Sequence, residues 1–116
     1  MCQFQYRLEI REYTTKEGRA PFSEWLLQLE DRRSRARILV RLNRIRLGNL
    51  RDSKSVGQSV FELRMTFGPG FRVYFARGGM TVILLLCGAD KRAQSKDIQK
   101  AKDCWADYRS RDNGQE

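Results

Sequence analysis

The sequence of 116 residues contains no histidine, only two prolines and only three cysteines. Because histidine is the commonest general acid and base in enzymes, any proton transfer must use carboxylates, lysine, tyrosine, cysteine or the substrate itself. Cys2, Cys87 and Cys104 are an odd number without a CxxC spacing, so neither a disulfide framework nor a zinc site is predicted. We assign the cysteines structural roles and expect a reducing cytoplasm.

Long apolar runs and a targeting segment are also missing. The longest apolar run, Val82 to Cys87, is far shorter than the roughly 20 residues of a membrane-spanning helix. Alternating polar and apolar residues follow Met1 at once, so no signal peptide is expected. The length suits one compact domain. We predict a single domain over residues 1–109, a short disordered tail over 110–116, a cytoplasmic location and no membrane partner.

The charge of the chain is strongly unbalanced. Lysine and arginine number 23, against 14 aspartate and glutamate residues, which gives a formal net charge of +9. Such an excess favours association with polyanions or with an acidic protein, and it carries no information about the fold.

Hydrophobic periodicity predicts an α+β domain that begins with a strand and two helices. Phe4 to Ile10 alternates apolar and polar residues, as a half-buried strand does. Pro21 suits the first turn of a helix, where its missing N–H is not needed. A second helix is predicted from about Asp31 to Leu47, with Gly48 as its C-terminal stop. The polar, turn-rich stretch Asn49 to Gly57 is predicted to be a loop.

Three further strands, separated by GPG at 68–70 and GG at 78–79, predict an antiparallel meander followed by a helix. A two-residue turn at GG pairs Phe75 with Val82. A turn at GPG pairs Arg64 with Tyr74. The C-terminal helix is expected from about Lys96 to Tyr108.

This register predicts two faces for the meander. The C-terminal helix or a bound partner is expected to cover the apolar half of the face opposite the core. The predicted core face comprises Phe61, Leu63, Met65, Phe71, Val73, Phe75, Val82, Leu84 and Leu86. The opposite face comprises Glu62, Arg64, Arg72, Tyr74, Ile83, Leu85 and Cys87.

An arginine stripe follows the second predicted helix. Arg33, Arg37, Arg41 and Arg44 recur at intervals of four, four and three residues, which places them along one side. The stripe is either a solvated face or a contact surface for nucleic acid or an acidic partner.

Several motifs resemble the RelE/ParE superfamily of bacterial toxins, and most closely its HigB-like "addiction module killer protein" branch. The resemblance extends from about Arg7 to Tyr108 and includes GRAPFSEWLLQL, VFELR, GPGFRVYF, LLLCGADKRAQ and KDIQKA in the expected order. VFELR and GPGFRVYF are specific in combination. The chain departs from the family at Arg51 and Ser59, where glycine is common, and at Ala89, where Gly-Gly-Asp-Lys is usual.

The resemblance implies a fold, an activity and a partner. The implied fold is a small antiparallel sheet with two helices packed on one face and a C-terminal helix. The implied activity is ribosome-dependent cleavage of mRNA, without a metal or other cofactor, through attack of the ribose 2′-hydroxyl on the adjacent phosphate. A cognate antitoxin, expected to be a small helix-turn-helix protein, would neutralise the toxin.

The resemblance also indicates catalytic residues. Arg64 and Arg72 match the family's sheet-face positions and are the candidates for gripping the scissile phosphate, because guanidinium groups offer fixed, multidentate donors. Alternatively, one of them neutralises Glu62. Lys91 is either a proton-transfer group or a simple phosphate contact.

RNA-binding candidates surround these positions. Lys54, Arg92 and Gln94 are predicted to contact substrate or ribosomal RNA. Tyr74 either stacks on a base or packs under a helix. Glu62 is the only carboxylate that the predicted register places on this face, but an arginine partner would lower its pKa and make it a weak general base.

Two other functions fit the same scaffold. One is a ParE-like poison of DNA gyrase that cleaves no RNA. The other is an inactive toxin homologue that only binds its antitoxin.

Overall fold

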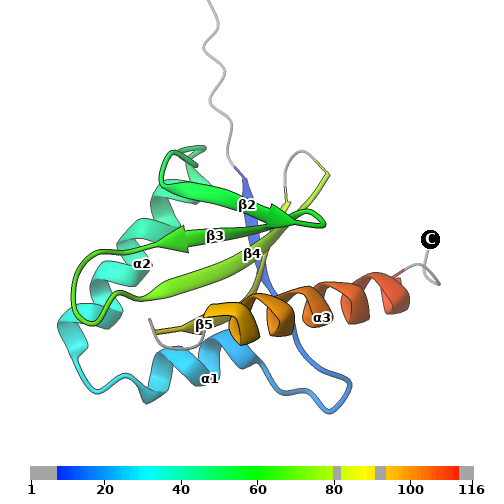
Figure 1. Cartoon of the computed structure of the whole chain (residues 1–116), viewed down its shortest axis with the longest axis horizontal. Helices are drawn as coiled ribbons and strands as arrows, with labels where there is room; N and C mark the ends of the chain where they lie inside the picture. Colours follow the sequence, from blue (N-terminus) through cyan, green and yellow to red (C-terminus); the bar gives the residue numbers. More distant parts are fainter. Residues whose placement is uncertain (1–7, 80–81, 91–93, 113–116) are drawn as a thin grey trace, which may run out of the picture.

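The structure is a computed structural model that describes residues 8–79, 82–90 and 94–112 (Figure 1). Five strands and three helices are found in these residues. Their bounds are β1 Glu9–Glu12, α1 Pro21–Gln28, α2 Arg32–Arg46, β2 Ser53–Gly57, β3 Val60–Arg64, β4 Arg72–Gly78, β5 Val82–Ala89 and α3 Gln94–Asp112.

The strands form one mixed sheet in the order β1-β5-β4-β3-β2 (Figure 1). β1 runs parallel to β5, and the remaining pairs are antiparallel. The predicted α+β class is therefore confirmed, as is the antiparallel meander of three consecutive strands, β3, β4 and β5.

Helices cover both faces of the sheet. α1 and α2 pack on one face, while α3 crosses the other (Figure 1). The core between the helix pair and the sheet includes Phe22, Ile38, Leu42, Ile45, Leu63, Val73, Phe75, Ile83 and Leu85. The core between α3 and the sheet includes Val60, Tyr74, Leu84, Leu86, Cys87 and Ala101.

The helix pair begins where the sequence predicts. Pro21 is the first residue of α1. Asp31 precedes α2 and accepts hydrogen bonds from the Arg33 backbone N–H and the Ser34 hydroxyl, both at 3.0 Å, as a helix N-cap does. These hydrogen bonds hold the pKa of the Asp31 carboxyl below its usual value. Gly48 follows α2 with a φ of 96°, a left-handed conformation that glycine adopts readily.

β2 was not predicted, because the whole stretch from Asn49 to Gly57 was expected to be a loop. Ser53–Gly57 instead pairs with β3 and forms an edge of the sheet. Its residues are small or polar, so the strand lacks the alternation of apolar and polar residues by which a strand is recognised in a sequence. Gln58 and Ser59 form the tight turn to β3 with φ values of 58° and 65°. The backbone of Ser59 therefore lies in the left-handed region that favours glycine, the residue that is common at this position in the family that the chain resembles.

The register of β4 with β5 differs from the prediction. Phe75 pairs with Leu85 rather than Val82, and Gly78 pairs with Val82, so three residues separate the strands instead of two. An odd displacement moves side chains to the other face of a sheet. Ile83 and Leu85 consequently lie under the helix pair, whereas Leu84 lies under α3. A bulge between Tyr74 and Phe75 keeps Cys87 on the predicted face.

The register of β3 with β4 also differs, but by an even number of residues. Tyr74 pairs with Glu62 rather than Arg64, and Arg64 pairs with Arg72. Because side chains alternate with a period of two, the predicted faces of β3 and β4 survive this error.

The bounds of the first strand and of the last helix differ from the predictions as well. β1 covers Glu9–Glu12, since its described residues pair with Val82 to Leu85 of β5; residues 4–7 of the predicted strand lie outside the described part. α3 continues through Ser110 to Asp112, so the predicted tail begins too early. Arg111 extends the helix by pairing with Asp107 at 3.0 Å and donating a hydrogen bond to the Thr14 carbonyl at 2.6 Å.

Trp25 of α1 packs directly against the backbone of Gly88 in β5. A Cβ atom at Gly88 would lie 2.1 Å from Cε3 of Trp25, far inside normal contact distance. Only glycine therefore permits this close approach of α1 to the sheet.

Replacing Gly88 with alanine is expected to destabilise the fold by roughly 1–3 kcal/mol, the usual cost of overpacking a core. Urea denaturation measures this loss. Gly78→Ala is the matched control in a neighbouring strand, because its Cβ would lie 3.7 Å from Val82 Cβ, an ordinary contact distance. Equal stability of the two variants would contradict the packing argument.

Candidate functional site

A buried carboxylate, that of Glu62 on β3, lies at the centre of the candidate site. Glu62 is fully buried. The Tyr74 hydroxyl donates a hydrogen bond to Oε2 of Glu62 at 2.8 Å, and Nε2 of Gln94 donates to the same oxygen at 2.9 Å. Burying an ionised carboxylate is costly unless donors and cations surround it, and these two donors meet part of that need.

Three cations surround the same carboxylate. Nε of Arg72 lies 3.4 Å from Oε2, Nη2 of Arg64 lies 3.5 Å from Oε1, and Nζ of Lys54 lies 3.9 Å from Oε1. Glu62 shares its single negative charge among these three cations, which leaves them able to interact with an anionic ligand as well.

Sheet register assembles this cluster. Lys54 of β2 and Tyr74 of β4 both pair directly with Glu62, one from each side. Arg64 lies two residues beyond Glu62 on β3 and so projects from the same face, where it pairs with Arg72. Gln94 is the first residue of α3 and reaches Glu62 from above the sheet.

The three cations differ in access to solvent. The side chains of Lys54 and Arg64 are 59% and 49% exposed, whereas that of Arg72 is 8% exposed. The Nε atom of Arg72 is buried and makes no hydrogen bond within the described residues, while its Nη1 donates to the Asp90 carbonyl at 3.4 Å. Lys54 and Arg64 are thus free to contact a ligand directly, and Arg72 supplies charge from below.

A hollow of about 460 Å³ opens beside Arg64 and Arg72. The turn over residues 68–70 forms its other wall. Gly68 has a φ of 60°, and a Cβ there would lie 2.9 Å from Cε2 of Phe71. Glycine at position 68 therefore favours this shape of the GPG turn.

The structure brings five of the predicted site residues together, namely Lys54, Arg64, Arg72, Tyr74 and Gln94. Lys91 and Arg92, the other two, lie outside the described residues.

Tyr74 takes the second of its two predicted alternatives, since it is fully buried and packs under α3. Burial and the hydrogen bond to Glu62 raise the pKa of its hydroxyl. Stacking of a base on this ring would require α3 to move. Within this structure Tyr74 positions Glu62.

Sequence reasoning missed Asp97, a second carboxylate near the cluster, contributed by α3. Burial is the main cause that raises the pKa of Asp97. The charge of Asp90 raises this pKa further, whereas the charges of Lys100 and Arg72 lower it. No pattern in the sequence predicts its position, because the register of α3 over the sheet is a tertiary feature.

Two members of the arginine stripe on α2 make internal contacts. Arg41 forms an ion pair with Asp52 at 2.9 Å, and the Arg37 guanidinium lies 4.3 Å from the centre of the Phe67 ring. These contacts tie α2 to Asp52, just before β2, and to Phe67, in the turn after β3. They account for half of the stripe without a ligand.

Neither described cysteine is an activated thiolate. Burial raises the pKa of Cys87 to about 12 and also raises the pKa of Cys104. Both thiols are free in the structure, in agreement with the structural role predicted for them.

Within residues 8–79, 82–90 and 94–112 no group of His, Cys, Asp or Glu side chains is arranged to hold a metal ion. No described helix has the length and apolarity needed to cross a membrane.

Fold and site together define a small α+β protein that carries a cationic cluster built around a buried glutamate. No family model matches the chain. It is 44% identical over 81 residues to an uncharacterized protein of Haemophilus influenzae, a match that covers 70% of this chain and 82% of that relative. The chain belongs to the same family as this Haemophilus influenzae protein.

The hydrogen bond between Tyr74 and Glu62 is expected to contribute to stability. Tyr74→Phe should lower the free energy of unfolding by roughly 1.5–3 kcal/mol, the range for hydrogen bonds to charged groups. In a Glu62→Gln background the same change should cost less, because the acceptor has lost its charge. A double-mutant cycle measured by urea denaturation gives the coupling. Additive costs would show that the two side chains do not interact as described.

Stability is expected to fall as the pH rises above about 9. Burial raises the pKa of Cys87 from 9.0 to about 12. Burial and a hydrogen bond to Asp107 raise the pKa of Tyr13 from 10.0 to about 12. Between these values the folded protein keeps protons that the unfolded chain has lost, so the free energy of unfolding decreases with pH. Denaturation at several alkaline pH values should show a shallower loss for Cys87→Ala, and an unchanged slope would contradict this assignment.

Proposed function

We propose that the chain is the toxin of a toxin-antitoxin module, with a RelE-like domain of the HigB-like branch of the RelE/ParE superfamily. Its activity would be cleavage of mRNA on the ribosome, in the cytoplasm, without a metal cofactor. The motif resemblance supports this proposal, as does the basic character of a chain with a net charge of +9.

The observation that carries the proposal is the pairing of Arg64 with Arg72 across neighbouring strands beside an open hollow. Glu62 lies within 3.5 Å of both guanidinium groups and so restricts their orientation. Lys54 adds a third positive charge from β2. A rigid group of cations suits a phosphodiester, because preorganised donors stabilise developing negative charge without reorganising during the reaction.

In the proposed reaction the ribose 2′-oxygen attacks the adjacent phosphorus. The 2′-hydroxyl loses its proton as its oxygen bonds to phosphorus, and the 5′-oxygen of the next nucleotide gains a proton as its bond to phosphorus breaks. The products are a 2′,3′-cyclic phosphate and a free 5′-hydroxyl. Arg64 would bind the phosphate directly, and Arg72 would stabilise the charge of the phosphorane from beneath.

Glu62 has a positioning role in this scheme rather than that of a general base. It is fully buried, and Tyr74 and Gln94 already occupy Oε2. A substrate hydroxyl would have to displace these donors to reach it. Lys91 stays a candidate for proton transfer or phosphate contact, and Arg92 a candidate for RNA contact.

The proposed partner is a cognate antitoxin, a small helix-turn-helix protein encoded in a neighbouring frame. Messenger RNA and the ribosome complete the set of partners.

Arg64→Ala and Arg72→Ala are each expected to reduce message cleavage by about 10²–10³-fold, the usual effect of removing one donor to a developing anion. Induction of the wild-type chain should arrest growth and produce new 5′ ends on translated messages. Mapping of 5′ ends in cells that express each variant measures the loss. Arg32→Ala is the matched control, because Arg32 is exposed on α2, on the other face of the sheet.

Circular dichroism must show that each variant is folded, particularly for Arg72, which is buried. Full cleavage by the folded Arg64 and Arg72 variants would show that the site is wrongly assigned. Intact messages with a DNA-damage response would indicate a gyrase poison instead. Normal growth with a stable antitoxin complex would indicate an inactive homologue.

A further inference from the structure

The outer face of α2 carries apolar side chains that the proposed endonuclease site does not use. The inner face of α2 packs against the sheet through Ser34, Ile38, Leu42 and Ile45. On the outer face, Leu39, Val40 and Leu47 are 50%, 52% and 54% exposed. Large apolar side chains exposed side by side on one surface mark a site of interaction.

Four outer residues follow one another with the spacing of a coiled coil. Ala36, Val40, Asn43 and Leu47 lie at intervals of four, three and four residues, which are the a and d positions of a heptad. All four are exposed. At 3.6 residues per turn they share a narrow stripe opposite the buried face, and such a stripe is the seam along which one further helix packs. We call these four residues the α2 seam.

Arginines flank the α2 seam on both sides. Arg37 and Arg44 occupy e positions of the same heptad, and Arg32 and Arg46 occupy g positions, where charges decide which partner a coiled coil accepts. All four are exposed. Arg32, Arg44 and Arg46 form no ion pair with any residue that the structure describes, and Arg46 donates instead to Oδ1 of Asn43 at 2.6 Å. α2 itself contains no acidic residue.

We propose that the α2 seam binds an acidic amphipathic helix of a partner protein. Apolar side chains of that helix would cover Leu39, Val40 and Leu47, and its glutamates or aspartates would face the flanking arginines. Charge complementarity thus defines the occupant at the same place where the apolar stripe defines its shape. The inference rests on α2 alone and not on the endonuclease activity.

A second copy of the chain is a poor occupant of the α2 seam. Two α2 helices packed along their seams would place arginine opposite arginine in either orientation, because both the e and the g positions carry this residue. Like charges that face each other across an interface oppose association. The partner helix therefore comes from a different protein.

RNA and a lipid bilayer, two other anionic surfaces, fit the α2 seam less well. A ribose-phosphate backbone would leave Leu39, Val40 and Leu47 uncovered, and α2 has no aromatic ring on which a base could stack. A helix that lies in a bilayer surface inserts a broad apolar face. The broad apolar face of α2 is already buried against the sheet.

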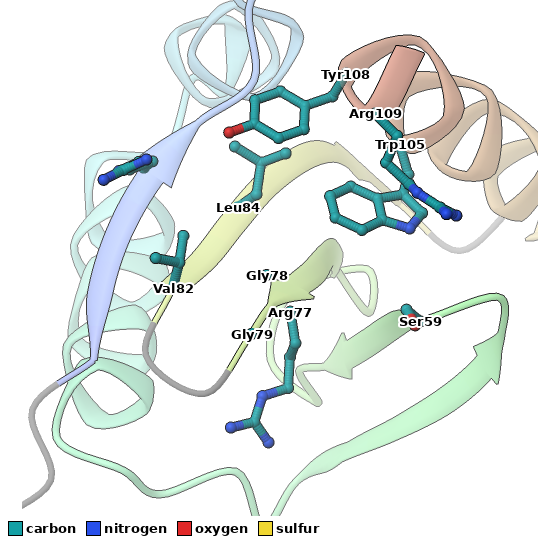
Figure 2. Close-up of a pocket in the computed structure, with 10 residues that line it drawn as sticks. Ser59, Arg77, Gly78, Gly79, Val82, Leu84, Trp105, Tyr108 and Arg109 are labelled. Carbon is teal, nitrogen blue, oxygen red and sulfur yellow. The ribbon is translucent and has the colours of Figure 1, made fainter. Parts of the chain in front are cut away.

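The other arginine-lined surface of the protein lacks such an arrangement. A second hollow, of about 620 Å³, lies between β4, β5 and α3, and Arg77 and Arg109 are among the residues that line it. Figure 2 shows the Arg77 guanidinium directed away from Trp105 and Tyr108, so the cations of this hollow do not converge on its apolar wall. The α2 seam combines both features in one stripe.

Selection from a phage library of helical peptides tests the proposal. The peptides contain about four heptads, with positions a, d, e and g randomised. Peptides that bind the wild-type chain should be enriched in leucine, isoleucine or valine at a and d and in glutamate or aspartate at e and g. A synthetic copy of a selected peptide with lysine in place of each acidic residue should bind roughly tenfold more weakly or worse.

Calorimetry on the selected acidic peptide locates its site. The double variant Arg32→Glu, Arg44→Glu should lose affinity by roughly tenfold or more, since acidic side chains then face each other. The neutral double variant Arg32→Gln, Arg44→Gln should also bind more weakly. The control Lys96→Glu, Lys100→Glu makes the same change in net charge at exposed positions of α3, and it should bind as the wild type does.

Val40→Ser tests the apolar part of the α2 seam. It should weaken binding of the peptide while the midpoint of urea denaturation stays that of the wild type, because Val40 is half exposed and outside the core. A fall in the midpoint equal to that of a core substitution would indicate a structural role instead and would contradict the proposal.

Three further results would overturn the inference. The first is a selection without acidic enrichment, and the second is undiminished peptide binding by the Arg32 and Arg44 double variants. The third is binding of an oligouridylate, of phosphatidylglycerol vesicles or of a second copy of the chain that these variants abolish while no selected peptide binds. Message cleavage should persist in all of these variants, so failure of this inference and failure of the proposed endonuclease are separately visible.

Discussion

The burial of one carboxylate is the constraint on which the candidate site depends. Glu62 lies in a sheet covered by α3 and has no contact with solvent. A carboxylate in that position is tolerated only with donors and cations around it, and here β2, β3, β4 and α3 each supply one or more. The same requirement that lets the fold accept Glu62 thus gathers Lys54, Arg64 and Arg72 at one place.

α3 links this constraint to the rest of the structure. Its first residue, Gln94, donates to Glu62, and near its other end Asp107 accepts a hydrogen bond from Tyr13 at 2.6 Å. Between these anchors the helix buries Tyr74 and forms one wall of the second hollow. Any partner that shifts α3 would therefore alter both the donor set of Glu62 and the hollow beside Arg109.

Local signals in the sequence located most of the elements but not their pairing. Pro21, Asp31 and Gly48 mark the helix pair because each has a conformational or capping preference that acts within a few residues. β2 was not predicted because an edge strand can form without an alternation of apolar and polar residues. The length of the β4 to β5 turn and the bulge beside Phe75 depend on contacts across the sheet, and both decided which residues of β5 lie under α3.

The sequence by itself determined the α+β class, the faces of β3 and β4, and the grouping of Lys54, Arg64, Arg72 and Tyr74, since all of these follow from a period of two or from short motifs. Only the tertiary structure decided that Glu62 is the buried centre of that set, that Arg72 is buried while Arg64 is exposed, and that Asp97 lies near them. These properties depend on strand register and on the placement of α3, which bring together residues as far apart in the chain as Lys54 and Asp97.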